Sequence, residues 1–173
     1  YIRNLMESKK GGSVVYNVGD NVVYPMHGAG VIEAIEEREV LGEKQKYYIM
    51  ALPIGDMKVM IPMNAVEEIG LRQVIDDEGV KRVFHILRGE KSAMSTNWNR
   101  RYRANMEKIK SGDIFSVAEV VRNLTIRDNE KGLSTGERKM LDTARQILIS
   151  ELVIAEDATE EVINKMMEET LEE

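Results

Sequence analysis

Residues 95–103, STNWNRRYR, combine the only tryptophan of the chain with three arginines. Trp98 is followed closely by Arg100, Arg101 and Arg103. An indole ring can stack on a base or wedge between base steps, and a planar guanidinium group pairs with phosphate oxygens. The polar lead before Trp98 predicts that a helix begins here, where free backbone N–H groups also favour phosphate. These residue types at this spacing therefore favour a contact with DNA.

Trp98 has a second role that the spacing allows equally well. It stands four residues before Tyr102 and eight before Met106, so it also extends an apolar helical stripe that packs in a core. The alternative for the arginines is an ordinary solvated helix face, although no acidic residue stands among them in the sequence. Both roles of Trp98 stay open at this point.

Other polar residues extend the candidate DNA-binding set. Asn97 directly precedes the tryptophan, and Arg138, Lys139 and Arg145 follow in a later helix. Arg138 and Arg145 are seven residues apart and therefore share one helix face. They are expected either to enlarge the positive surface or to be ordinary surface charges.

The basic residues are clustered although the chain of 173 residues has a formal charge of -6. Residues 91–110 contain six basic residues and one acid, whereas residues 151–173 contain nine acids and one base. The C-terminal segment therefore sets the overall sign. A clustered basic segment in an acidic protein is compatible with an anionic partner.

Several kinds of chemistry lack the residues that they need. There is no cysteine and there are only two histidines, His27 and His85, without metal-ligand spacing. HGAG at 27–30 lacks the phosphate-loop pattern, and its glycines are expected to supply a turn. No nucleophile–base motif is present. We therefore expect no metal, no cofactor and no enzymatic activity.

The sequence also bears on the compartment. No apolar run approaches the roughly 20 residues that span a bilayer, and no secretory leader is recognisable. The absence of cysteine is typical of a reducing cytoplasm. We expect a cytoplasmic protein without a membrane partner.

The first half of the chain has the pattern of short strands. Segments 21–25, 30–40, 46–52 and 57–62 are rich in β-forming residues, and turn signals separate them. This pattern predicts a small antiparallel barrel. In MKVMIP at 57–62, alternation places Met57, Val59 and Ile61 on one side and Lys58 and Met60 on the other.

The second half has helical periodicity. Helices are expected near 76–89, 97–112, 113–128, 134–152 and 157–171. Asp113 is a predicted N-cap, and Ser134 with Glu137 forms the pattern of a capping box. The predicted fold is α+β. A β domain at 16–72 precedes a domain of about five helices at 76–173, and residues 1–15 form a flexible extension or a remnant of expression.

Three quoted segments resemble the CarD/CdnL family of bacterial RNA polymerase-binding transcription regulators. VGDNVVYPMHGAGVIEAIEEREVLGEKQKYYIM resembles the N-terminal domain, which also occurs in the transcription-repair coupling factor. TNWNRRYRANMEKIKSGDIFSVAEVVRNL and KGLSTGERKMLDTARQIL resemble the helical C-terminal domain. The likeness runs from about Asn17 to about Ala155.

The resemblance implies a Tudor-like β domain that docks on the RNA polymerase β subunit. It also implies a helical domain that touches promoter DNA near the minus-ten element, at the upstream edge of the melted bubble. Trp98 matches the tryptophan that wedges into the minor groove there, and the result is a more stable open complex. Such a protein is associated with the nucleoid through the polymerase.

The residues that the resemblance points to form two sets. Basic DNA-facing positions of the family fall at Arg100, Arg101, Arg103 and Arg138. The expected polymerase-binding residues are Arg38, Lys58, Met60, Ile61 and Pro62. Family members often carry an arginine where Met60 stands, which favours a more apolar contact here.

Two other functions remain compatible with the sequence. One is a self-sufficient DNA-binding protein, which would need a longer basic surface. The other is a protein–protein interaction module without DNA contact, in which Trp98 lies in the core.

Overall fold

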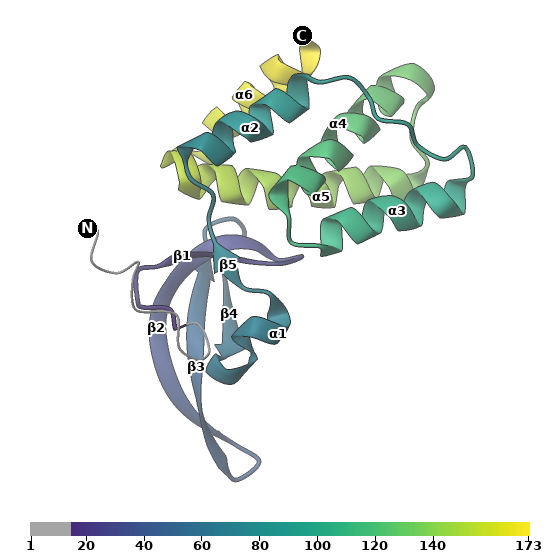
Figure 1. The fold of residues 1–173 in the computed structure, drawn as a ribbon. Coiled ribbons are helices and arrows are strands. Elements are labelled where there is room, and N and C mark those ends of the chain that lie inside the picture. Colours follow the sequence, from purple (N-terminus) through teal and green to yellow (C-terminus); the bar gives the residue numbers. More distant parts are fainter. Residues whose placement is uncertain (1–14) are drawn as a thin grey trace.

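The computed structural model describes residues 15–173. Except for Val15, the expected extension at 1–15 lies outside the described residues. A five-stranded antiparallel sheet comes first in the chain and a group of helices follows it (Figure 1). The expected α+β order is confirmed.

The sheet has the strand order β4-β3-β2-β1-β5, and its neighbouring strands are antiparallel. The strands are β1 (Asn21–Tyr24), β2 (Gly28–Val40), β3 (Glu43–Leu52), β4 (Met57–Pro62) and β5 (Arg72–Gln73). A 3-10 turn (Met63–Ala65) and the short helix α1 (Val66–Ile69) connect β4 to β5. The long β2–β3 ribbon projects away from the helices (Figure 1).

The hairpin turns follow from residues that adopt positive φ. Leu41 and Gly42 have φ of 53° and 82°, as the tight β2–β3 turn requires. Gly28 opens β2 with a φ of 100°. Gly30 was expected to lie in a turn, and this expectation is wrong. It lies within β2, where an added Cβ would overlap the Ala51 carbonyl oxygen.

Five helices form the second half, as predicted. They are α2 (Asp77–Arg88), α3 (Trp98–Lys110), α4 (Ile114–Lys131), α5 (Thr135–Glu156) and α6 (Glu160–Glu172). Each begins after a side chain that accepts a hydrogen bond from a backbone N–H of the first turn. These caps are Asp76, Asn97, Asp113, Ser134 and Thr159. The predicted caps Asp113 and Ser134 are thus confirmed.

The described chain has two separate hydrophobic cores. One is formed by the sheet and the segments packed on it, and it includes Ile32, Tyr48 and Met50. The other lies among the helices and is formed mainly by α2, α4 and α5, with contributions from α3 and α6. Burial of these apolar surfaces stabilises each half.

Helix α3 connects the sheet side of the molecule to its outer end. Its C-terminal end lies beside the sheet, and its N-terminal end, which begins at Trp98, lies at the far side of the helical group (Figure 1). Trp98 is therefore presented away from the β strands.

Candidate nucleic-acid interface

The N-terminus of α3 is set by Asn97. The Asn97 side-chain oxygen accepts a hydrogen bond from the Arg100 backbone N–H at 3.0 Å, so the helix begins at Trp98. The first turn contains no acidic residue. This arrangement leaves the positive end of the helix dipole without a local counter-charge.

Trp98 is held in place and is also open to solvent. Its indole N–H donates a hydrogen bond to the Ser134 hydroxyl at 3.0 Å. The ring stacks on Tyr102 with centroids 5.0 Å apart and an interplanar angle of 22°. The side chain is nevertheless 42% exposed. The ring is therefore not sealed in the core, and one part of it remains available to a partner.

Gly136, in the first turn of α5, lies against the indole. An added Cβ at Gly136 would lie 3.4 Å from the Trp98 ring and 3.9 Å from the Tyr102 ring. The N-terminal end of α5 therefore forms part of the surface on which the indole packs. Ser134 has two tasks there, because its hydroxyl also caps α5 by accepting from the Glu137 N–H.

The expectation that Arg101 faces DNA is wrong. Arg101 is only 4% exposed, and its guanidinium donates to both carboxylate oxygens of Glu137 at 2.8 and 3.2 Å. It also donates to the Ser95 carbonyl at 3.0 Å. Arg101 is thus a structural residue that ties α3 to α5. The sequence near Arg101 shows no acid because its partner stands 36 residues further on.

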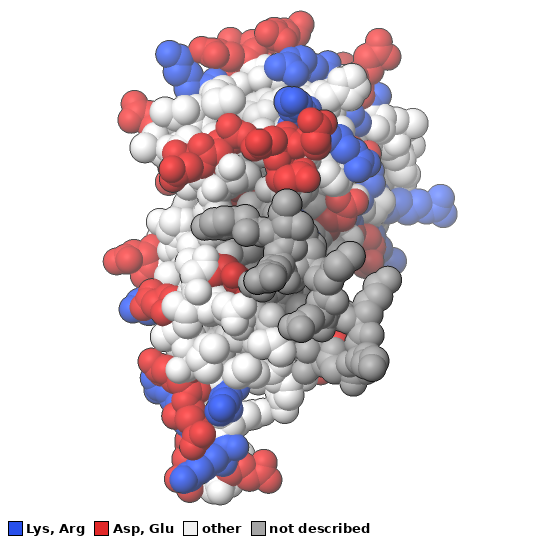
Figure 2. Space-filling view, turned by 60° about the vertical axis from the view of Figure 1, so that its left-hand side comes forward, with Lys and Arg blue, Asp and Glu red and all other residues white. Residues whose placement is uncertain are grey.

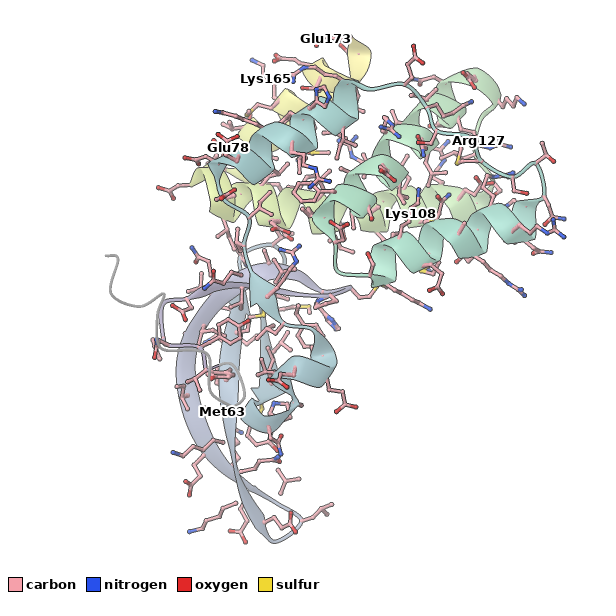
Figure 3. All side chains as sticks on the ribbon, in the orientation of Figure 1. Met63, Glu78, Lys108, Arg127, Lys165 and Glu173 are labelled. Carbon is pink, nitrogen blue, oxygen red and sulfur yellow. The ribbon has the colours of Figure 1, made fainter. Side chains whose placement is uncertain are left out.

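Glu137 takes a different partner from the one its capping-box pattern predicts. Its carboxylate binds Arg101, and Arg127 of α4 lies 3.7 Å away (Figure 3). Hydrogen bonds from Arg101 lower the pKa of Glu137, and the charges of Arg101 and Arg127 act in the same direction. This buried group fixes α3, α4 and α5 around the tryptophan.

The other basic candidates differ in solvent exposure and in whether they form an ion pair. Arg100, Arg103 and Lys139 are exposed, and none of them forms an ion pair within residues 15–173. Arg138 is exposed but pairs with Asp128 at 2.8 Å. Arg145 is half-buried near the Asn164 side chain.

Charge is distributed unevenly over the helical half. Figure 2 shows a band of acidic side chains across the helical half, with several Lys and Arg side chains beside it, and α6 itself carries five acidic residues and one lysine. The free basic groups Arg100 and Arg103 belong to α3, on another part of this half. An anionic partner is therefore favoured at α3 and disfavoured at α6.

The second candidate surface is the edge strand β4. It pairs with β3 on one side only. Met60 is 43% exposed, and Lys58 points outward and binds Glu33 at 2.6 Å. The Glu33 hydrogen bond raises the pKa of Lys58. The edge thus offers an apolar side chain beside a cation whose charge is already paired.

Two expectations for this strand need correction. Ile61 was expected to bind the polymerase, but its side chain is 0% exposed in the sheet core. Met57 was placed on the same side as Ile61, yet it is 53% exposed near the strand end. Pro62 is half-buried. Arg38 lies on the β2 ribbon and pairs with Glu36 at 2.8 Å.

In residues 15–173, the described part of the chain, no group of three or more histidine, cysteine or acidic side chains is arranged to hold a metal ion. None of the helices in this part is long and apolar enough to cross a bilayer.

Two domain families match the chain. The family described as "CarD, C-terminal domain" matches residues 82–168, and the one described as "CarD-like/TRCF RID domain" matches residues 16–75. The chain is 46% identical over 149 residues to YdeB of Bacillus subtilis (strain 168), named as a candidate transcription factor. The match covers 86% of this chain and 97% of YdeB.

Two solved structures from Myxococcus xanthus are also similar. The solution NMR structure of the 72-residue N-terminal domain of CarD has 36% identity and a TM-score of 0.31, and the match covers 36% of this chain and 84% of that one. The structure CdnLNt has 33% identity and a TM-score of 0.32, and the match covers 39% of this chain and 96% of that one.

A β domain of the RID type joined to a helical domain with a surface tryptophan defines a two-domain transcription regulator. The chain belongs to the CarD/CdnL family. The resemblance found in the sequence is thereby confirmed.

Proposed function

We propose that this regulator binds the RNA polymerase β subunit and stabilises the promoter open complex. In this proposal residues 16–72 form the polymerase-binding domain, and residues 76–173 contact DNA at the upstream edge of the bubble near the minus-ten element. The protein acts in the cytoplasm, at the nucleoid, as an adaptor without enzymatic activity. The observation that carries the proposal is the solvent-open indole of Trp98 beside unpaired basic groups.

The DNA contact rests on Trp98 with the exposed cations around it. The ring is held from one side by Tyr102 and Ser134, so little conformational freedom remains to be lost on binding. Arg100 and Arg103 supply phosphate contacts that orient the ring. The remaining members of the DNA-facing set are Asn97, Arg138, Lys139 and Arg145, of which Arg138 must exchange Asp128 for a phosphate.

The polymerase contact rests on the outward side chains of β4. A free strand edge can gain backbone hydrogen bonds from a partner strand, and Met60 adds apolar area. Lys58, Pro62 and Arg38 lie around this contact. Tethering at β4 gives the helical domain a high effective concentration at the promoter, which explains how an acidic protein acts on DNA.

A promoter-melting assay tests the proposal. A fluorophore in the minus-ten region reports the lifetime of the open complex formed by polymerase with this protein. We expect Trp98→Ala to lose the added lifetime, and Lys58→Ala/Met60→Ala to shift half-saturation to higher protein concentration. Lys81→Ala, an exposed change on α2, serves as the control.

The outcomes separate the proposed function from its alternatives. A folded Trp98→Ala protein that retains the full effect would contradict the DNA contact. If the Lys58/Met60 variant acts with unchanged half-saturation, the β4 contact is wrong. A protein that prolongs the lifetime equally well when the polymerase contact is lost would be a self-sufficient DNA-binding protein.

A further inference from the structure

Arg72 of β5 joins the β domain to two elements of the helical domain. Its Nη2 donates to Glu151 of α5 at 2.7 Å, and its Nη1 donates to the other oxygen of the same carboxylate at 2.8 Å. Its Nε donates to the Gly112 carbonyl, between α3 and α4, at 2.8 Å. A bidentate guanidinium–carboxylate pair fixes an angle as well as a distance.

Glu151 is the centre of this junction. It is 1% exposed, and the Ile75 backbone N–H donates to it at 2.9 Å in addition to Arg72. Ile75 belongs to the short connection between β5 and α2. One carboxylate therefore holds both the last strand of the sheet and the start of the link to the helices.

The neighbouring residue of α5, Ser150, makes a second contact with the sheet. The Ala29 N–H of β2 donates to the Ser150 hydroxyl of α5 at 2.9 Å. A Cβ added at Gly28 would lie 2.5 Å from the Ser150 hydroxyl oxygen, and one at Gly112 would lie 3.0 Å from the Pro25 ring. The two domains thus touch through positions without side chains, and at two separate points.

The consequence for Trp98 follows from the direction of α3. This helix runs from the junction, at Gly112, to the outer end of the molecule, at Trp98 (Figure 1). At 1.5 Å per residue the helix is about 20 Å long, so a rotation of about 10° at the junction displaces the ring by about 3.5 Å. That displacement is comparable to the thickness of one base.

We propose that Arg72 and Glu151 are positioning residues that hold the two domains at one fixed angle. A β domain seated on the polymerase then delivers Trp98 to one place on the DNA. The inference rests on the proposed function. It adds that the contact at β4 and the contact at Trp98 work together only while the ion pair of half-buried Arg72 with buried Glu151 keeps the angle between the domains.

The first experiment measures the angle itself. The chain has no cysteine, so Glu67→Cys on α1 and Asn129→Cys on α4 provide two exposed sites for spin labels. Double electron–electron resonance then gives the distribution of distances between the domains. We expect a narrow distribution for the parent protein and a broad one for Arg72→Ala.

Two further variants separate geometry from stability. Arg72→Met/Glu151→Met removes both charges, so that no unpaired charge is left buried, and it removes the directional hydrogen bonds. We expect a broad distribution for this folded variant as well. Arg122→Lys is the matched control, because Arg122 is a buried arginine whose hydrogen bonds stay within the helical domain. Its distribution should remain narrow.

The second experiment asks whether the angle matters for the open complex. In the promoter-melting assay we expect the Arg72 variants to reduce the maximal added lifetime by about fivefold or more. The protein concentration at half-saturation should remain unchanged, because the β4 surface is intact. A purely structural role would instead reduce the amount of active protein and raise the apparent half-saturation. Arg72→Lys retains the charge without the bidentate geometry. Its maximal added lifetime should lie between those of the parent protein and Arg72→Ala.

The outcomes distinguish this inference from the proposed function. A narrow distance distribution in Arg72→Ala or in Arg72→Met/Glu151→Met, or an undiminished maximal lifetime in these two variants, overturns the positioning role. If Trp98→Ala loses the effect while Arg72→Ala and Arg72→Met/Glu151→Met retain it, the proposed function stands and the inference fails. If Trp98→Ala retains the effect, the proposed function itself fails.

Discussion

Arg100 and Arg101 are adjacent in the sequence, but the structure predicts opposite consequences of replacing them. Arg101 is 4% exposed and binds Glu137 through two hydrogen bonds. Removal of one partner from a buried ion pair leaves the other charge uncompensated, at a cost of about 3–5 kcal/mol. Arg127 and Ser134 remain beside Glu137 and moderate this cost. We therefore expect Arg101→Ala to lower the free energy of unfolding by about 3 kcal/mol.

This change is large enough to measure by ordinary unfolding methods. In a chain of 173 residues that unfolds as one unit, each kcal/mol lowers the Tm by about 2–4 °C, so the Tm should fall by roughly 10 °C. Urea unfolding followed by far-UV circular dichroism at pH 7 gives the free energy directly. Arg100→Ala is the matched control and should stay within about 0.5 kcal/mol of the parent protein.

A double variant tests the physical cause. Arg101→Met/Glu137→Met removes both charges and should recover most of the stability lost in Arg101→Ala, because no unpaired charge remains buried. An Arg101→Ala protein as stable as Arg100→Ala would refute the buried ion pair. It would restore Arg101 as a candidate for DNA contact.

The remaining predictions concern acid stability, the tryptophan and the free arginines. The pKa of Glu137 is lowered in the folded state, so its stabilisation is complete above the unfolded value of about 4.3 and is lost as the pH falls through the lower folded value. In acid titrations of stability, Glu137→Gln should therefore show a shallower decline below about pH 4.5 than the parent protein, and an identical decline would exclude Glu137 as the cause. Trp98→Ala should cost about 2 kcal/mol in urea unfolding, since it loses the Tyr102 stack and one hydrogen bond, whereas a loss of 3–5 kcal/mol would indicate a core role. Arg100→Ala and Arg103→Ala should each reduce the slope of log affinity against log salt by about 1 in DNA binding by the polymerase complex, and an unchanged slope would mean that the residue touches no phosphate.

Much of the fold could be predicted because it depends on local patterns. Alternation and turn residues located β3 and β4, and periodicity with caps such as Asp113 located the helices. Parts of the site could not be predicted from such local patterns. Ile61 and Met57 share a side by alternation, yet one is buried and the other is exposed, because the end of β4 extends beyond the core.

The candidate site shows the same division. The sequence identified Trp98 and the basic cluster, and the structure places an exposed indole there with Arg100 and Arg103 exposed beside it. No local pattern indicated the roles of Arg72 and Glu151, because these residues stand 79 positions apart. Only a paired pattern across many related sequences could have indicated such a contact in advance.

The sequence by itself determined the order of the strands and helices, caps such as Asp113 and Ser134, and which family the chain resembles. These features depend on residues within a few positions of one another, since a cap or a turn is completed by its own neighbours. The tertiary structure alone decided which of three neighbouring arginines is buried, what the Ser134 hydroxyl holds and how the two domains are joined. Those outcomes depend on partners from distant segments. A buried charge is costly unless an opposite charge or a hydrogen-bond partner lies beside it, and the fold brings that partner from elsewhere in the chain.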